Sequence, residues 1–280
     1  MANAYHVPGS TSMAAAAWDD GIGFAQDATL IFDAPHGENQ DVNLFCDQSA
    51  LPQVTSLDFQ PTFSGSIGTT ANPLKTGAKT RIQNAAMGGI LSLMAACIAG
   101  TGAANTIALF IQSGTGRTDL LGGTVTEVQQ GAGVINVNSS TVVTTVNHSG
   151  GTATYEYNAT PITTLTAQTG MIILKRQVTT LVNHSALIIY DTVLNCTNFT
   201  DGPTAVTDWR GGNIATGNMA GTFTVENATR ACTIGSTAFR PWASAKINRN
   251  TQAGVAVTFS NETPIAGGPR TAAIGSVVGA

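Results

Sequence analysis

A short phrase recurs along this chain at nearly constant spacing, and this repeat limits the possible folds more than any other feature of the sequence. VVTTVNHS at 142–149 returns as QVTTLVNHS at 177–185, with PITTLTAQT at 161–169 between them. The common template is an apolar residue, two positions usually held by Thr, and a second apolar residue. Successive copies start 17, 18, 18, 19, 16 and 15 residues apart. Their first positions are Ile90, Ile107, Val125, Val143, Ile162, Val178 and Val193.

This spacing is too short for helical hairpin repeats, which need about 30 residues or more, and too long for a single strand. It matches one coil of a parallel β-solenoid, whose short strands stack on those of the next coil at about 4.8 Å. One coil cannot bury its inner face alone, so several must stack. The sequence therefore predicts an all-β parallel β-solenoid with coils of 15–19 residues. A right-handed β-helix is expected, because the coils lack hexapeptide periodicity.

Each copy also predicts the course of the chain around one coil. Val143 and Val146 are expected to point inward, with Thr144 and Thr145 at a corner between two short strands. Thr suits a corner because it is β-branched and its hydroxyl can satisfy a backbone group. After a polar bend, a second apolar run completes the coil. These runs are VINV (134–137), ATYEY (153–157), MIILK (171–175) and ALIIY (186–190).

The repeat divides the chain into regions. We expect the first residues of all seven copies to form a single interior file, the solenoid core, in a body of coils at 76–205. Residues 1–20 are expected to be an extended arm, and 21–75 a cap with the first coil, since a solenoid end exposes unpaired backbone groups. After about 205 the pitch is lost, which predicts an irregular β region at 206–280 that caps the stack or contacts another subunit.

The surface must be built largely from uncharged polar residues. Only 10% of the residues are charged, against about 25% in an ordinary soluble protein. The sequence shows none of the clustered Lys and Arg of a nucleic-acid-binding protein. The most apolar stretch, 88–100, is too short to span a bilayer, and we interpret it as a coil because Ile90 and Leu93 fall on the repeat register. The first residues show no secretory signal, which predicts folding in a cytoplasm.

One segment resembles a known group of proteins. Residues 18–68 contain Trp18, the pair Phe32–Asp33, the run Val54–Leu57 and then Phe59. This order is similar to the opening of many parallel β-helix proteins of phages and bacterial surfaces. Among these, proteins made without a signal peptide are most similar to phage virion parts, namely capsid decoration proteins, head fibres and tailspikes. The resemblance implies a homotrimer whose N-terminal arm docks on the particle.

Two sets of titratable residues could carry chemistry. Glu156, Lys175 and Asp191 each follow the end of a strand, so we expect them to stack as an acid–base–acid column on adjacent coils. The two acids would lie about 9.6 Å apart, which an inverting glycosidase allows. A charge ladder between coils accounts better for the intervening Lys175. His148 and His184 take matching places in the repeat, two coils apart, and are interpreted as turn residues rather than ligands of a shared metal ion.

The sequence predicts no catalytic residue, no cofactor and no metal site, and the four cysteines are interpreted as small buried residues. We expect a non-enzymatic structural protein of a virus or phage particle, assembled in the host cytoplasm and located in the virion. It would be a capsid decoration (cement) protein or a fibre or spike component. Expected partners are further copies of the chain, the major capsid protein or other virion proteins, and a host-surface glycan, but neither nucleic acid nor a membrane. The alternatives are a polysaccharide-binding adhesin or tailspike-type depolymerase and, more remotely, an ice-binding solenoid with a Thr ladder.

Overall fold

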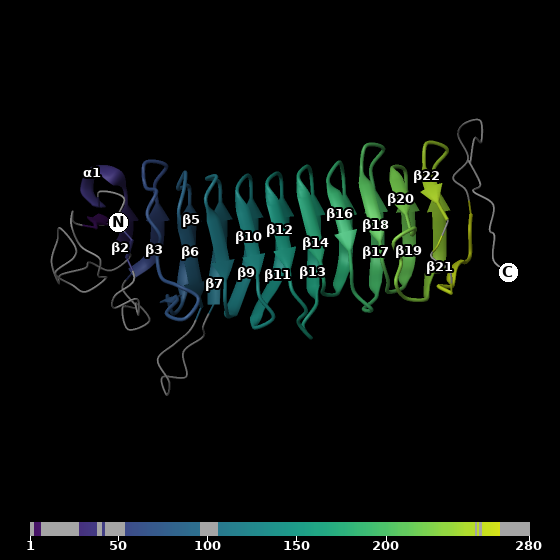
Figure 1. The fold of residues 1–280 in the computed structure, drawn as a ribbon, viewed down its shortest axis with the longest axis horizontal. Coiled ribbons are helices and arrows are strands. Elements are labelled where there is room, and N and C mark those ends of the chain that lie inside the picture. Colours follow the sequence, from purple (N-terminus) through teal and green to yellow (C-terminus); the bar gives the residue numbers. More distant parts are fainter. Residues whose placement is uncertain are drawn as a thin grey trace. The chain divides into compact units, whose positions relative to one another are not determined.

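The computed structural model describes residues 3–6, 28–37, 41–42, 54–95, 106–249, 251 and 254–263. In these residues the architecture is all-β, apart from one short helix, α1 (Ala34–Gly37). The strands form two parallel sheets of 13 and 10 strands, and in each sheet the strands follow one another in chain order (Figure 1). The prediction of a parallel β-solenoid is confirmed.

We call the two sheets the long sheet and the short sheet. After β1 and β2 of the long sheet, the chain alternates between the two sheets from β3 onward, and one strand from each makes a coil. The long sheet consists of β1 (Asn3–Tyr5), β2 (Ala28–Phe32), β3 (Val54–Phe59), β5 (Lys79–Asn84), β7 (Thr106–Gln112), β9 (Gly123–Gln130), β11 (Thr141–His148), β13 (Ile162–Ala167), β15 (Val178–Asn183), β17 (Cys196–Asp201), β19 (Ile214–Met219), β21 (Cys232–Pro241) and β23 (Val257–Phe259). The short sheet consists of β4 (Leu74–Lys75), β6 (Ile90–Met94), β8 (Arg117–Leu120), β10 (Val134–Val137), β12 (Thr152–Tyr155), β14 (Met171–Leu174), β16 (Leu187–Tyr190), β18 (Val206–Trp209), β20 (Thr222–Thr224) and β22 (Lys246–Asn248).

The chain divides into two compact units, residues 1–144 and 145–280, with the boundary inside β11. The predicted boundaries at 75 and 205 do not mark this division. Each unit is itself a stack of parallel coils, and we refer to them as unit 1 and unit 2.

Five of the predicted core residues are interior. In unit 1, Ile107 lies beside Val125 on the neighbouring strand, and in unit 2 Ile162 lies beside Val178. These four side chains and Val143 are at most 1% exposed. Because side chains alternate between the two faces of a strand, the residues flanking them point outward.

Ile90 and Val193 do not belong to this file, and the prediction is wrong for both. Ile90 begins β6 in the short sheet and is 40% exposed. In the long sheet it is Lys79 that lies beside Ile107. Lys79 is buried, and burial lowers the pKa of its ammonium group to about 8. Val193 is 59% exposed and precedes β17, whose first residue, Cys196, is buried instead.

The Thr corner lies within one strand rather than between two. β11 runs unbroken through Thr144 and Thr145, although both point outward between the buried Val143 and Val146. Two successive outward side chains break the alternation of a regular strand, so the strand must bend locally. Each coil therefore contains two strands, not the three of the expected strand, corner, strand, bend, strand order.

The bend into the short sheet depends on glycine in places. Gly170 precedes β14 with a φ of +86°, a conformation that other residues rarely adopt. A Cβ atom at this position would lie 2.4 Å from the Gly151 carbonyl oxygen of the coil before it. The close stacking of successive bends therefore requires a residue without a side chain here.

Both ends differ from expectation. Residues 3–6 are not a free arm, because β1 pairs with β2 and the side chains of Ala4 and His6 are buried; residues 7–20 of the predicted arm lie outside the described residues. At the other end, parallel pairing continues beyond 205 through β20, β22 and β23. In the described part of this region, the pairing of β19 with β21 contains a register shift.

Aromatic side chains fill much of the interior of unit 2. Tyr190 and Trp209, adjacent in the short sheet, stack with ring centroids 3.8 Å apart and planes 4° from parallel. Phe199 of the long sheet meets the edge of the Trp209 ring at 5.8 Å. The indole Nε1 donates to the Gly212 carbonyl at 2.9 Å, so the buried polar atom of the ring has a partner.

Candidate interaction surface

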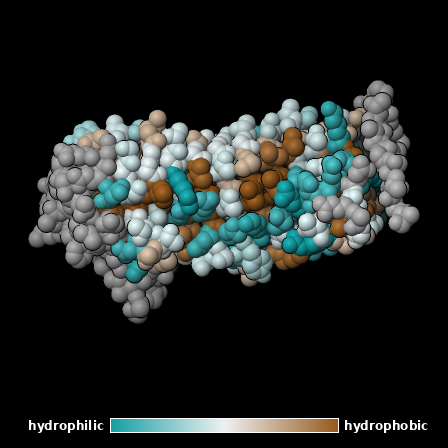
Figure 2. All heavy atoms as spheres, viewed as in Figure 1, coloured by the Kyte–Doolittle hydropathy of each residue, from teal (hydrophilic) through white to brown (hydrophobic). Residues whose placement is uncertain are grey.

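In unit 2 the outer face of the short sheet is aliphatic on β14 and β16 and at the start of β18. Strands β14, β16 and β18 pair residue for residue, which stacks equivalent side chains in files. One file is Met171, Leu187 and Val206, and in the next file Ile173 lies beside Ile189. Leu187 and Val206 are 38% and 40% exposed. We call these five residues the aliphatic patch, and Figure 2 shows hydrophobic residues gathered where Figure 1 draws β14 and β16.

This face is unusual for a sheet that meets water on its outer side. Such strands normally alternate between apolar and polar residues, whereas continuous apolar strands are typical of sheets covered on both faces. The sequence MIIL of β14 is apolar throughout, with Ile172 and Leu174 buried and Met171 and Ile173 directed outward. The composition of β14 therefore resembles that of a strand whose outer face is covered.

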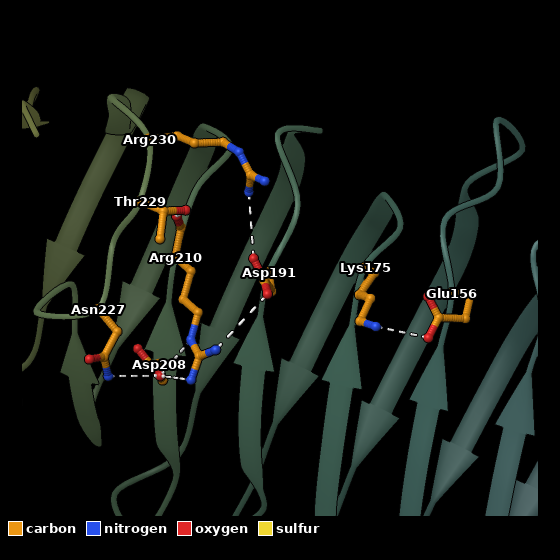
Figure 3. Close-up of polar contacts among 8 residues, drawn as sticks. All are labelled: Glu156, Lys175, Asp191, Asp208, Arg210, Asn227, Thr229 and Arg230. Atoms are coloured by element: carbon orange, nitrogen blue, oxygen red, sulfur yellow. Dashed lines mark hydrogen bonds and ion pairs between the residues drawn. The ribbon is translucent and has the colours of Figure 1, made fainter.

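A column of charged residues borders the patch where the strands end. Glu156, Lys175, Asp191 and Arg210 follow β12, β14, β16 and β18, so their charges alternate in sign from coil to coil (Figure 3). The backbone fixes this order, because the amide of each later residue donates to the preceding coil, as Lys175 N does to the Tyr155 carbonyl at 2.9 Å. We call these four residues the charged column.

Two ion pairs connect neighbouring members of the column. Lys175 Nζ lies 2.8 Å from Glu156 Oε1, and an Arg210 guanidinium nitrogen lies 3.9 Å from Asp191 Oδ2. Arg230 approaches the other oxygen of Asp191 at 3.5 Å. Arg210 also donates to Asp208 at 2.9 Å. Lys175 and Asp191 are thus each directed to a different neighbour, as Figure 3 shows.

The predicted members of the column lie on successive coils as expected, but the column is longer than the sequence reasoning inferred. Arg210 and Arg230 were missed, and they neutralise Asp191. A signal for Arg210 was present in the sequence: Arg210 follows Trp209 as Asp191 follows Tyr190, and the two aromatic rings stack.

The arrangement does not favour glycoside hydrolysis. That reaction needs one carboxyl group as a proton donor and another to activate water or attack the sugar. Here Glu156 is paired with Lys175, and Asp191 with two arginines. A small hollow in unit 1 beside Phe59 and Phe63 has no titratable side chain among its described lining residues.

The same face of the short sheet is different in unit 1. There Arg117 contacts Asp119 at 2.8 Å, and Asn136 on the next strand donates to the same carboxylate oxygen at 2.8 Å. The exposed Ile90 and Val134 flank Arg117 on either side. Aliphatic neighbours therefore do not form a continuous file in unit 1.

A file of buried polar side chains lies on the inside of unit 2, and sequence reasoning did not anticipate it. His148, Ala167, Asn183 and Asp201 occupy equivalent positions at the ends of successive long-sheet strands. Asn183 holds the following bend by donating to the Ala186 carbonyl at 3.1 Å and accepting from the Ala186 amide at 2.9 Å. Polar residues at this position stabilise the bends by supplying hydrogen bonds that the backbone there lacks.

Burial shifts the protonation of two members of this file. Desolvation raises the pKa of the Asp201 carboxyl to about 6, although the amides of Ala220 and Gly221 donate to Oδ1 and oppose the shift. The other oxygen, Oδ2, has no hydrogen-bond partner among the described residues. Desolvation lowers the pKa of the His148 imidazole to about 4.

The two histidines of the repeat are not equivalent. His148 is buried in register with Ala167 and then Asn183, whereas His184 follows Asn183 and is exposed. The later phrase has one additional residue, Val182, before its Asn-His-Ser. A shift of one residue along a strand moves a side chain to the opposite face. The histidine of the earlier phrase therefore points into the core, and the histidine of the later phrase points to solvent.

The outer face of the long sheet in unit 2 forms a second surface, rich in Thr and Asn. Its strands place Thr145 beside Thr164, Thr164 beside Thr180, Thr180 beside Asn198, and Asn198 beside Thr216. The parallel outward file is Asn147, Thr166, Val182, Thr200 and Asn218. From β11 to β19 neither file carries a charged residue, and on β21 the second file continues at Arg240.

In the part of the chain that the structure describes, no three His, Cys, Asp or Glu side chains gather closely enough to hold a metal ion. Cys196 and Cys232 are free and buried, and Cys46 and Cys97 lie outside the described residues. No helix in the described segments has the length and apolar character needed to cross a membrane. No family model, curated protein or solved structure matches the chain. The architecture itself defines the class as a parallel β-solenoid protein.

Proposed function

We propose that this chain is a non-enzymatic structural protein of a virus or phage particle, either a capsid decoration protein or a fibre or spike component. The observation that carries the proposal is the stacking of coils in register, with surface charges paired between coils. In such a stack the backbone hydrogen bonds continue from coil to coil, which suits a load-bearing role. The long files of side chains on its surface suit contacts with other proteins. The resemblance of residues 18–68 to phage β-helix proteins supplies the virion setting.

The proposed partners are the major capsid protein or other virion proteins, together with further copies of the chain. The experiment is immunogold electron microscopy, with antibodies raised against the purified chain, on virus particles from the source of the sequence. Regular labelling at fixed positions on intact particles is the expected result. The virion role is contradicted if an immunoblot of purified particles, loaded at equal total protein, detects none of the chain.

A second candidate function is adhesion to a hydroxyl-rich surface, such as a polysaccharide. The Thr and Asn files of β11 to β19, which carry no charged residue, favour it, because hydroxyl and amide groups can exchange neutral hydrogen bonds with sugars. Glycan-array binding, lost on Thr164→Glu and Thr180→Glu together, supports this candidate. Release of reducing ends from capsule or lipopolysaccharide indicates a depolymerase instead, and thermal hysteresis of ice growth indicates the ice-binding alternative.

A further inference from the structure

We propose that unit 2 pairs with a second copy of this chain through the aliphatic patch and the charged column, about a two-fold axis. The axis runs parallel to the strands, midway between β14 and β16. This inference does not rest on the virion role. It identifies a second copy of the chain as the layer that covers the aliphatic patch.

The first argument is the apolar composition of the face. Met171, Ile173 and Leu187 are directed outward from strands whose inner residues already fill the core. The free energy gained by covering apolar side chains is roughly proportional to the apolar area removed from water. A single contact removes more of this area when the aliphatic side chains are adjacent than when they are scattered. An aliphatic face of this kind gains by contact with another apolar surface.

The second argument identifies the occupant from charge complementarity. Read along the coils, the column is negative, positive, negative, positive. A two-fold axis parallel to the strands reverses the order of the coils and keeps the direction of the strands. It therefore places Lys175 opposite Asp191 of the second copy, and Glu156 opposite the second copy's Arg210.

The same operation also matches the apolar residues. β14 faces β16 of the other copy, so that Met171 meets Leu187 and Ile173 meets Ile189. At the edge of the contact β18 faces β12, and Val206 meets the methyl-bearing side chain of Thr152. A two-fold interface is isologous, meaning that one surface serves both partners and must complement itself. A column of four alternating charges beside paired aliphatic files meets this condition.

The ion pairs within one chain are compatible with this arrangement. Lys175 turns toward Glu156 and Asp191 turns toward Arg210, so the proposed axis passes between two ion pairs rather than through one. The side chains of Lys175 and Glu156 are 42% and 43% exposed, which leaves each able to meet a further partner. Charges at the border of an apolar contact mainly set register and specificity.

The size of the patch predicts a weak dimer. Four strands of four residues cover roughly 19 Å by 13 Å, which is small beside a standard protein interface. We therefore expect a dimer that dissociates on dilution, and one that would escape notice at low concentration. In a ring of three copies each interface joins two different surfaces, so the charged column of one copy would not face the charged column of the next.

The experiment is sedimentation velocity of the full chain over a wide concentration range, with charge reversals on either side of the axis. Lys175→Glu places like charges opposite Asp191 of the partner, and Asp191→Lys places like charges opposite its Lys175. Each variant alone is expected to weaken dimerisation by at least about tenfold. An equimolar mixture of the two is expected to restore it as a heterodimer, because both facing pairs again have opposite signs.

Two further variants keep the result interpretable. Leu187→Glu is expected to abolish the dimer, whereas Val193→Glu, in the same coil but outside the patch, leaves it unchanged. Arg81→Glu reverses a charge on the long sheet and is also expected to have no effect. Thermal unfolding of each variant checks that it is folded. A wild-type chain that is monomeric throughout, a trimer, or single reversals that dimerise like wild type would each overturn the proposal.

Discussion

The inside and the outside of unit 2 treat polar groups in opposite ways. On the inside, His148 and Asp201 are buried beside the bends, and desolvation favours their neutral forms. On the outside, Lys175 and Asp191 are charged, solvated and paired with neighbours. Buried groups of this kind affect folding strongly, while exposed ion pairs contribute little. The comparison separates residues that hold the coils together from residues that remain available for recognition.

The largest effect is expected from Trp209→Ala. Trp209 is fully buried and stacks on Tyr190, so its removal leaves a cavity and should lower the free energy of unfolding by about 3–5 kcal/mol. The neighbouring residue provides the control, because Arg210→Ala removes an outward side chain and should cost less, about 1–2 kcal/mol, mainly by leaving the nearly buried Asp208 carboxylate without its cation. Urea unfolding followed by circular dichroism measures both, and similar losses for the two variants would contradict the comparison.

A smaller effect is expected from His148 at acid pH. Its folded-state pKa of about 4 lies below the ordinary value of 6.5, so its contribution is present above pH 6.5 and is lost as pH falls toward 4. The loss amounts to roughly 3 kcal/mol by linkage. In His148→Ala, which places at this position the residue found in the next coil, Ala167, this part of the acid dependence should disappear.

The measurement is urea unfolding of wild type and variant at pH 7, 5.5 and 4. The other carboxyl groups titrate in both proteins, so the difference between the two curves isolates His148. A difference that stays constant with pH would show that the imidazole does not titrate as its burial implies.

Asp201 should show the opposite sign. Its folded-state pKa is raised from 3.8 to about 6, so its protonated form is favoured, and stability falls as pH rises from 3.8 through 6. Asp201→Asn keeps an oxygen that accepts from the backbone amides and removes the charge. We expect it to raise the free energy of unfolding at pH 7 by about 1–2 kcal/mol and to change little at pH 4.

Asn183→Asp is the matched reverse change in the preceding coil. It introduces a buried carboxyl group and removes the donor that the Ala186 carbonyl accepts from, so it should destabilise the protein more at pH 7 than at pH 4. If either variant changes the free energy of unfolding equally at both pH values, an ionised carboxylate in this buried file is not destabilising, and the interpretation is wrong.

The smallest effect is expected on the outside. Lys175→Ala breaks the ion pair with Glu156, in which both side chains are more than 40% exposed. Such pairs contribute at most about 1 kcal/mol, so the unfolding free energy should change little at low or high salt. A loss as large as that of Trp209→Ala would show that the charged column is structural rather than available for contact.

The sequence predicted the fold well because burial in a solenoid repeats with the coil. Val143, Ile162 and Val178 could be identified since each copy of the template must place an apolar residue inside. Ile90 and Val193 could not be excluded, because a template of four residues records neither the sheet to which it belongs, as for Ile90, nor whether its first residue lies in a strand at all, as for Val193. Lys79 in the interior breaks the apolar rule altogether.

The surface was predicted less completely, for a physical reason. Glu156, Lys175 and Asp191 could be aligned from strand ends, since stacking in register needs only the repeat. The inner polar file was missed because Asn183 and Asp201 are polar residues between apolar segments, and such residues are normally predicted to lie in solvent-exposed turns. Only the hydrogen bonds to the following bend distinguish them from solvated residues.

The pairing of each strand with the one a full coil later also bears on how such a chain can evolve. Duplication or loss of a whole coil leaves every neighbour with an equivalent partner, so the protein can grow or shrink in complete turns. Within a coil of unchanged length, single positions can differ: Asn-His-Ser stands one position later in the repeat at β15 than at β11, so Asn183 occupies the interior position that His148 holds two coils earlier. Val143 precedes the start of β12 by as many positions as Val178 precedes the start of β16, so the residue at an interior position can be exchanged while the path of the coil stays the same.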